Sequence, residues 1–312
     1  MDDSYDLIII GGGPAGYTAG IYASRALLNT LIITSYIQPP QVVLTDIVEN
    51  YPGFPEGING FDFIEKVKQQ AEKFGCKMTV SEVVKIEKQD KHFEVHLSSK
   101  AILKTKAIII ASGRRNKKLS VEKEEEFIGK GISYCAVCDA PLYRYKTVAV
   151  IGGGDTAFSE AIYLTKFVNK LYLIHRREQF RATKLLQKRL LSDELKDKVE
   201  VVIPYIVEKF VGEDRLNGVV IRNLKTNNVE IIHCDGVFVC IGYQPNTEFL
   251  NGIVKLDDNG YIITDINLQT SQPGIFACGD CRQNTLKQVV YACADGAKAA
   301  LSAVEFIENN KF

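Results

Sequence analysis

Two stretches of this chain share one pattern of hydrophobic and polar positions: a short apolar run, a cluster of glycines, and a segment rich in alanine. The first stretch has apolar residues at 7–10, then Gly11 to Gly16, then an alanine-rich segment that reaches Ala23. The second has a run at 147–151 that is apolar after Thr147, glycines at 152–154 and a helical segment through Leu164. Such a run predicts a buried β-strand, a tight turn and an α-helix. We therefore predict an α/β fold that contains two copies of one strand–turn–helix unit.

The glycine spacing in both copies is typical of a dinucleotide-binding turn. In the first, Gly11 permits the turn, Gly13 lets the backbone approach a pyrophosphate, and Gly16 lets helix and strand pack closely. The pyrophosphate would lie on the free N–H groups at the start of the helix. In the second copy Gly152, Gly154 and Ala157 take the places of these three glycines, and Asp155 and Thr156 complete the predicted binding turn. Two copies predict two bound dinucleotides and an electron-transfer enzyme; a glycine-rich turn without a ligand is the alternative interpretation.

The two copies differ at the position that should select the ligand. An Asp or Glu usually follows the second strand of a unit that binds an unphosphorylated ribose, about 20 residues after the glycines. In the second copy this position has Arg176 and Arg177, preceded by His175 and followed by Arg181. Guanidinium groups suit a 2′-phosphate, because they bind it with bidentate, charge-assisted hydrogen bonds. This copy is therefore predicted to select NADPH over NADH, with a solvated basic face as the alternative; His175 is given no role in proton transfer.

The second strand of the first copy, residues 31–34, is followed by Ser35 and has no acidic residue at this position. The usual ribose contact is therefore absent or made differently, and the sequence does not identify what replaces it.

Composition and charge exclude several classes of protein. A length of 312 residues suggests two domains. The 38 basic and 38 acidic residues balance, which argues against a nucleic-acid or membrane-surface partner. The chain has no apolar run of about 18 residues and begins with an acidic segment, so we expect neither a membrane span nor a secretory signal. In a cytoplasmic protein, eight cysteines are expected to be catalytic or buried thiols.

A pair of cysteines precedes the second copy, in the segment Cys135-Ala136-Val137-Cys138-Asp139. The C-x-x-C spacing lets two sulfurs close and reopen a small disulfide ring and tends to lower the pKa of one thiol. The Asp139 carboxylate could give a proton to a departing thiolate. Half of a zinc site is the alternative, although zinc needs four ligands. The other C-x-x-C, Cys278 to Cys281, lies far along the chain, so we expect no metal.

In this order and spacing, the motifs resemble those of the low-molecular-weight, bacterial-type thioredoxin reductases, nearly from end to end. Four further motifs carry the resemblance: Glu49 to Gly53, Ala111 to Gly113, Gly242 to Thr247, and Gly274 to Asp280. The resemblance implies two Rossmann-like nucleotide-binding domains. One is a discontinuous FAD-binding domain, residues 1–113 and 243–312. The other is an inserted NADPH-binding domain, residues 114–242, with the redox-active cysteines.

The resemblance also implies the reaction and the partner. Electrons pass from NADPH through FAD to the Cys135–Cys138 disulfide, and the resulting dithiol reduces a thioredoxin. Cys138 is implied to lie nearest the flavin, Cys135 to attack the thioredoxin, and Asp139 to act as acid and base. Relatives are homodimers, and they rotate one domain on the other about the two crossings, for which Ser112-Gly113 and Gly242 are the hinge positions.

The resemblance implies contacts to FAD from residues dispersed along the chain: Gly11, Gly13, Pro14, Ala15, Gly16, Thr34, Ser35, Gln41, Asn50, Gly279, Asp280, Lys287, Gln288 and Val289. Asp280 is implied to bond the ribityl chain, and a helix over 295–306 is expected to pack nearby. Three departures concern this site. Pro39-Pro40-Gln41 stands where relatives have Gly-Gly-Gln, which removes N–H donors. The acidic residue usually before that stretch is missing, and Lys287-Gln288-Val289 replaces Arg-Gln-Ala.

The remaining cysteines are interpreted as structural. Cys278 and Cys281 are expected to be small buried residues beside the flavin, with an auxiliary redox pair as the alternative. Cys76, Cys234, Cys240 and Cys293 are expected to be core or partly buried thiols. Two other functions stay open: a related flavin-dependent reductase with another disulfide partner or electron donor, and a dinucleotide-binding sensor that is not an enzyme.

Overall fold

The computed structural model describes residues 4–35, 40–44, 47–48 and 50–310. Its internal contacts divide the chain into two compact units. The first unit comprises Met1–Arg115 and Gln244–Phe312, and the second comprises Asn116–Tyr243. The first unit is therefore built from two separate stretches of chain, and the second from one.

A seven-stranded sheet forms the centre of the first unit, in the order β3-β2-β1-β6-β5-β4 with β17 also paired to β6. Its strands are β1 (Ser4–Ile10), β2 (Thr30–Thr34), β3 (Lys77–Val80), β4 (Val83–Lys88), β5 (Phe93–Leu97), β6 (Ile102–Ile110) and β17 (Ile275–Ala277). Strands β1, β2, β3, β6 and β17 pair in parallel, and β4 and β5 add an antiparallel hairpin. The parallel core is the arrangement that strand–turn–helix units produce.

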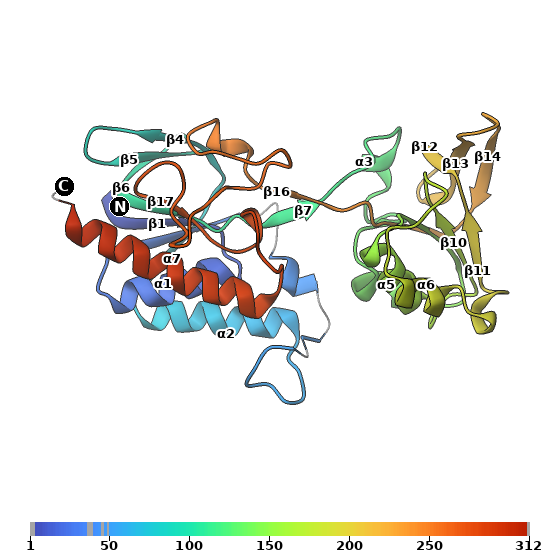
Figure 1. Ribbon diagram of the computed structural model, residues 1–312, viewed down its shortest axis with the longest axis horizontal. Coiled ribbons are helices and arrows are strands. Elements are labelled where there is room, and N and C mark those ends of the chain that lie inside the picture. The colour runs from blue at the N-terminus through green and yellow to red at the C-terminus, as the bar shows by residue number, and fades with distance from the viewer. Residues whose placement is uncertain (1–3, 36–39, 45–46, 49, 311–312) are drawn as a thin grey trace. The chain divides into compact units, whose positions relative to one another are not determined.

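Three helices, α1 (Pro14–Arg25), α2 (Gly60–Lys73) and α7 (Val289–Asn309), lie along one face of this sheet (Figure 1). Successive side chains of a strand point to opposite faces. Leu7 and Ile9 therefore pack under the helices, while Ile8 and Ile10 pack against the other side with Leu250 and Ile262. Because both faces are covered there, β1 is apolar from Leu7 to Ile10.

Helix α7 is longer than expected, since it begins at Val289 and not at Asp295. Val289 and Val290 are β-branched and have lower helix propensity than alanine, which is why the sequence pattern placed the start too late. Packing of Ala292 and Cys293 into the core overrides that propensity.

The second unit has a five-stranded parallel sheet in the order β11-β10-β9-β15-β8 and a three-stranded antiparallel sheet in the order β12-β13-β14. The parallel strands are β8 (Ile132–Ser133), β9 (Thr147–Ile151), β10 (Lys170–Ile174), β11 (Val199–Val202) and β15 (Gly236–Val239). The antiparallel strands are β12 (Tyr205–Gly212), β13 (Leu216–Asn223) and β14 (Val229–His233). The helices are α3 (Glu124–Phe127), α4 (Ala136–Asp139), α5 (Asp155–Leu164) and α6 (Lys184–Leu190).

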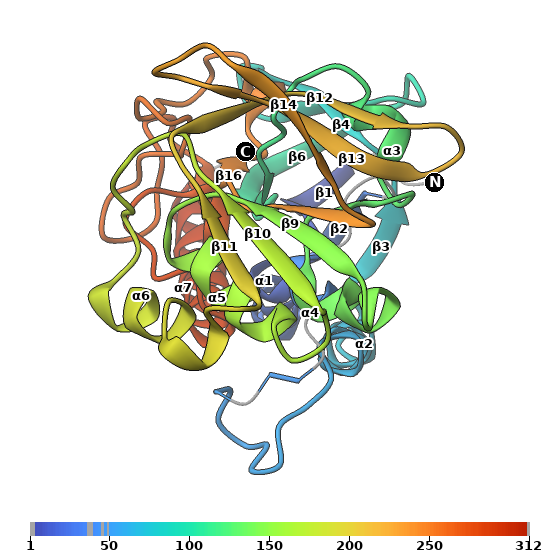
Figure 2. The same cartoon turned by 90° about the vertical axis from the view of Figure 1, so that its right-hand side faces the viewer.

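The parallel sheet of the second unit is covered on both faces (Figure 2). Val148 and Val150 of β9 pack against α5, and Ala149 and Ile151 pack toward β12 and β13. The predicted α/β fold with two Rossmann-like units is confirmed. Five short 3-10 helices complete the described structure: Gln41–Leu44, Ala140–Tyr143, Asp193–Leu195, Glu248–Leu250 and Gly279–Cys281.

The chain passes between the units twice, at β7 (Arg114–Asn116) and β16 (Tyr243–Pro245), and these two strands pair with each other. Beside them, the Asn246 N–H donates to the Gly113 carbonyl over 3.0 Å, and the Ser112 hydroxyl donates to the Asn246 carbonyl over 2.6 Å. Across the part of the chain that the structure describes, no helix combines the length and the apolar character that crossing a membrane requires.

Candidate functional site

The first glycine turn connects β1 to α1. A Cβ atom on Gly11, where φ is +120°, would lie 2.2 Å from the Ala111 carbonyl oxygen, and one on Gly16 would lie 1.9 Å from the Gly11 carbonyl oxygen. Both positions therefore require glycine. A Cβ atom on Gly13 would meet no described atom within 4 Å, and Gly13 caps α1 without a side-chain hydrogen bond. Open space in front of an uncapped helix start fits a pyrophosphate.

The second glycine turn, between β9 and α5, has the same construction. A Cβ atom on Gly152 would lie 2.3 Å from the Cys240 carbonyl oxygen, and one on Gly154 would meet no described atom within 4 Å. Gly154 is the N-cap of α5 and also lacks a side-chain cap. The Asp155 carboxylate, in the first turn of α5, accepts the Thr183 N–H over 2.7 Å. This turn also fits a pyrophosphate, with Thr156 and Ala157 continuing the helix.

Residues from the C-terminal stretch return to the first glycine turn. A Cβ atom on Gly279 would lie 2.9 Å from that of Ala15, and Gly296 of α7 packs on the Ala15 carbonyl. The Asn50 amide donates to the Gln288 side chain over 3.0 Å, at the residue that precedes Val289 and α7. Among the residues of the predicted FAD site, the structure thus brings Gly279 to the start of α1 and joins Asn50 to Gln288. The Gln41 amide donates to the Arg114 carbonyl over 3.0 Å.

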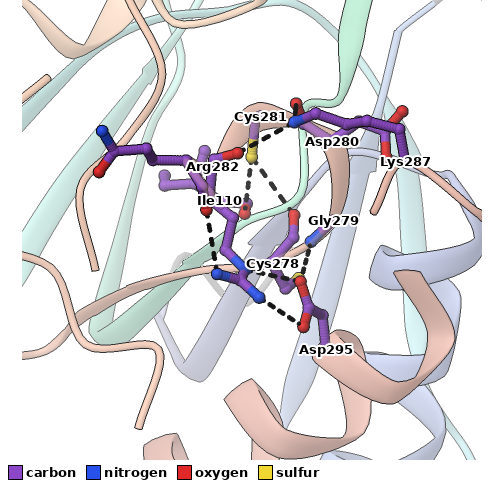
Figure 3. A network of polar contacts seen from close by, with 9 residues as sticks. Ile110, Cys278, Gly279, Asp280, Cys281, Arg282, Lys287 and Asp295 are labelled. Carbon is purple, nitrogen blue, oxygen red and sulfur yellow. Dashed lines mark hydrogen bonds and ion pairs between the residues drawn. The ribbon is translucent and has the colours of Figure 1, made fainter. Parts of the chain in front are cut away.

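Asp280 and Lys287, both predicted to contact FAD, lie in one polar network (Figure 3). The Asp280 carboxylate lies 3.0 Å from the Arg114 guanidinium, and burial raises the pKa of Asp280 against the opposing charge of Arg114. The Lys287 ammonium donates to the carbonyls of Asp280 and Arg282 over 2.9 and 3.0 Å. Burial lowers the pKa of Lys287. Lys287 therefore stabilises the backbone of the turn at residues 280–282, which contains Asp280.

The arginine-rich stretch of the second unit lies beside its glycine turn. The N–H groups of Arg181 and Ala182 both donate to the Gly153 carbonyl, over 2.8 and 3.1 Å. The side chains of Arg176, Arg177 and Arg181 are exposed. The His175 ring is buried against Phe180, with 5.5 Å between ring centroids. Burial, and then the charges of the three arginines, lower the pKa of His175.

The C-x-x-C segment lies in the second unit, between β8 and β9. Cys135 is half-buried and disulfide-bonded, which does not fit the alternative of a zinc ligand. The Ser133 hydroxyl accepts the Cys135 N–H over 3.0 Å and donates to the Cys135 carbonyl over 3.2 Å. The Asp139 N–H also donates to that carbonyl, over 3.3 Å. The backbone of Cys135 is thus held on both sides; the side chain of Cys138 lies outside the described residues, as do Pro39 and Glu49.

Residues 5–296 match the family described as pyridine nucleotide-disulphide oxidoreductase. The chain belongs to this family. A thioredoxin reductase of Treponema pallidum is 40% identical over 308 residues, which are 99% of each chain. The crystal structure of Lactococcus lactis thioredoxin reductase matches with a TM-score of 0.84 and 37% identity, over 98% of this chain and 100% of that one. The thioredoxin reductase of T. acidophilum matches with a TM-score of 0.81 and 31% identity, over 97% and 98%.

The predicted resemblance to the thioredoxin reductases is therefore confirmed, and the chain is an oxidoreductase of this family. The family implies a flavin and a pyridine nucleotide as cofactors. The two glycine turns fit these cofactors, because each leaves open space in front of an uncapped helix start.

Glu160, on α5, was not identified from the sequence. Its Oε2 accepts the Ala136 N–H over 3.2 Å and lies 3.2 Å from the Cys240 thiol, which donates to it. Burial raises the pKa of Glu160, and burial followed by the carboxylate charge raises that of Cys240, which stays a thiol. Ala136 follows Cys135 directly, so this carboxylate ties the disulfide segment to α5. The two residues are 24 positions apart, so no local sequence pattern indicates this contact.

A buried ion pair in the first unit was also missed. Two nitrogens of the Arg282 guanidinium donate to the Asp295 carboxylate, Nε over 2.6 Å and Nη2 over 2.9 Å (Figure 3). The Gly279 N–H donates to the same carboxylate over 3.1 Å. The pair fixes the Gly279 turn against α7. The sequence feature that could have indicated this ion pair is a basic residue, Arg282, soon after Gly279-Asp280, followed by an acidic residue, Asp295, in a helix.

The predicted burial of the remaining cysteines agrees with the structure. Cys278 and Cys281 are free thiols with no exposed surface. The Cys281 thiol donates to the Ile110 carbonyl over 3.4 Å, and burial raises the pKa of Cys281 to about 11. Cys76, Cys234, Cys240 and Cys293 are also free and buried, which confirms the prediction of core thiols.

Proposed function

We propose that this chain is a thioredoxin-disulfide reductase that uses NADPH and FAD. In this proposal residues 1–113 and 243–312 bind FAD, and residues 114–242 bind NADPH and carry the redox-active cysteines. The thioredoxin reductases that match over nearly the whole chain support the substrate class. We further propose that the protein works as a homodimer in the cytoplasm.

The observation that carries the proposal is the disulfide at Cys135, inside a C-x-x-C segment of the unit that also has the arginine-rich edge. A protein that only sensed a dinucleotide would need no reversible disulfide beside its nucleotide turn. Six of the other cysteines are buried free thiols. We propose Cys138 as the partner of Cys135, because a C-x-x-C pair closes a small ring that is readily reopened.

Each group of residues has a distinct task in this reaction. Arg176, Arg177 and Arg181 hold the 2′-phosphate of NADPH through charge-assisted hydrogen bonds. The bound flavin would supply the relay of electrons between the nucleotide and the disulfide. Two electrons and two protons convert the Cys135–Cys138 disulfide to a dithiol.

The dithiol then reduces the thioredoxin by thiol–disulfide exchange. The Cys135 thiolate attacks one sulfur of the thioredoxin disulfide and forms a mixed disulfide, while the other thioredoxin sulfur leaves as a thiolate. The Cys138 thiolate attacks Cys135, restores the internal disulfide and releases the second thioredoxin thiolate. Asp139, half-buried at the end of α4, exchanges the proton that these thiolates need.

The test separates nucleotide oxidation from disulfide transfer. The variant Cys138→Ser should keep reduction of the flavin by NADPH, because the flavin and nucleotide turns are unchanged. It should lose thioredoxin turnover, because the mixed disulfide cannot be resolved. Anaerobic titration with NADPH, read at the flavin absorption band, followed by addition of oxidised thioredoxin, measures both steps. Cys234→Ser, which alters a buried thiol of the same unit, is the control and should retain turnover; thioredoxin turnover in Cys138→Ser would contradict the proposal.

A further inference from the structure

The end of β2, which lacks an acidic residue of its own, has one supplied by another part of the chain. Strand β3 pairs with β2 in parallel, with Thr34 opposite Val80, and the Ser81 N–H donates to the Thr34 carbonyl over 2.9 Å. The chain therefore emerges from β3 beside the end of β2. There the Ser35 hydroxyl donates a hydrogen bond to the carboxylate of Glu82.

This strand end also adjoins the first glycine turn. The Gly11 N–H donates to the Ile33 carbonyl over 2.9 Å, and a Cβ atom on Gly12 would lie 2.5 Å from the Thr34 methyl group. In open α/β sheets, ligands bind beyond the carboxyl ends of the strands. Glu82 thus lies at the edge where the ligand of the first glycine turn binds.

We infer that Glu82 binds the adenosine ribose of the dinucleotide in the first unit, in place of the acid that usually ends the second strand. An ionised carboxylate has about four acceptor sites, so the bond from Ser35 leaves room for ribose hydroxyls. The Ser98 N–H donates to the Glu82 carbonyl over 2.8 Å and fixes the backbone of this residue. The inference rests on the proposed function, because it takes FAD as the dinucleotide of this unit.

The charge of Glu82 also gives the first unit a selectivity. A carboxylate accepts hydrogen bonds from a 2′-hydroxyl but repels a 2′-phosphate, so the site favours FAD and opposes NADPH. The second unit, with exposed arginines at the matching edge, has the opposite preference.

The experiment measures flavin affinity, without turnover. The full-length protein is stripped of flavin and titrated with FAD, and binding is followed by flavin fluorescence. In Glu82→Ala, the dissociation constant for FAD should rise about tenfold, because hydrogen bonds to a charged acceptor are lost. FMN has no adenosine half, so its dissociation constant should be equal in the wild type and the variant. Glu72→Gln, on the exposed side of α2, is the variant control and should bind FAD as the wild type does.

A ligand change provides the complementary test. FAD with a 2′-deoxyadenosine half should bind the wild type more weakly than FAD does, and Glu82→Ala should bind the two ligands about equally. Equal FAD affinity in the wild type and Glu82→Ala would overturn the inference, as would an equal loss of FMN binding. If Glu82→Ala does not fold, Glu82→Gln keeps the shape and should still weaken FAD binding while leaving FMN binding unchanged. A wild-type protein that folds but binds no FAD would instead refute the proposed function.

Discussion

The two nucleotide units build the same glycine turn and differ in what lies beside it. An added Cβ atom would collide with a backbone carbonyl at both Gly11 and Gly152, and it would meet no described atom within 4 Å at Gly13 and Gly154. At the next strand end, the first unit has Glu82, bonded to Ser35, and the second has exposed arginines. The turn can accommodate any pyrophosphate, so in our proposal the choice between dinucleotides depends on the residue type at the ribose edge.

If these residues select the dinucleotide as we propose, the two units do so with differently placed segments of chain. In the second unit the arginines follow β10 directly, and the backbone of Arg181 is tied to Gly153. In the first unit the acid comes from the chain after β3, 47 residues beyond Ser35, and strand pairing brings it into place. The edge is thus one location in the fold, and different segments can fill it.

The largest effects should come from filling the open space in each turn. Gly13 has φ −89° and Gly154 has φ −103°, which any residue can adopt, so valine at either position should leave the fold intact. The new side chain would occupy the space of the pyrophosphate. Gly13→Val should weaken flavin binding about 100-fold, and Gly154→Val should weaken NADPH binding about 100-fold, because several hydrogen bonds to a charged group are lost.

Measuring both ligands in both variants tests the comparison directly. Flavin fluorescence reports the first turn, and calorimetric titration with NADP⁺ reports the second. Each variant should lose its own ligand and keep the other, and without ligands its thermal unfolding should be close to that of the ligand-free wild type. Loss of flavin in Gly154→Val, in a protein that remains folded, would show that the turns are assigned to the wrong cofactors.

A smaller effect is expected from the arginine edge. Removing two exposed charge-assisted contacts, each contributing about 1 kcal/mol, should raise the KM for NADPH about 30-fold in a double variant Arg176→Ala, Arg177→Ala. The KM for NADH should change little, because NADH has no 2′-phosphate. Steady-state kinetics with both nucleotides measure the ratio. A variant with Lys188→Ala and Arg189→Ala, which removes two exposed charges from α6, is the matched control; a double arginine variant that still prefers NADPH as strongly as the wild type would disprove the role.

The smallest effect concerns His175 and pH. Folding lowers the pKa of this imidazole through burial and the neighbouring arginines, so the unfolded chain binds the proton more readily. The contribution of His175 to stability is therefore complete above its unfolded pKa of about 6.5 and is lost as the pH falls through the lowered value. Urea unfolding at pH 7.5 and 5.5 should show a larger loss of stability in the wild type than in His175→Gln. His233→Gln, at an exposed histidine, should behave as the wild type does; an equal pH dependence in His175→Gln would contradict this assignment.

Sequence reasoning predicted the local features and missed those that depend on strand order. The glycine turns were predictable because a positive φ at Gly11 and a carbonyl 2.2 Å from its added Cβ leave no alternative to glycine. The buried strands were predictable because β1 and β9 are apolar on both faces.

The contacts that escaped prediction join distant segments. Glu160 meets Ala136 because α4 packs beside α5, and Glu82 meets Ser35 because β3 pairs with β2. Arg282 and Asp295 form an ion pair across the segment that leads into α7. Glu160, Glu82, Arg282 and Asp295 are ordinary charged residues in their own stretches of sequence, and only the packing of elements gives each a specific partner.

The discontinuity of the first unit has a consequence for how the protein is synthesised. Strand β17 completes the parallel sheet on β6, and α7 packs along α1, so residues 1–115 cannot bury their apolar faces alone. During translation the whole second unit is synthesised before β17 and α7, the strand and the helix that complete the first unit. We therefore expect the nascent chain to expose an incomplete hydrophobic surface until α7 has been synthesised, which is the kind of surface that chaperones shield.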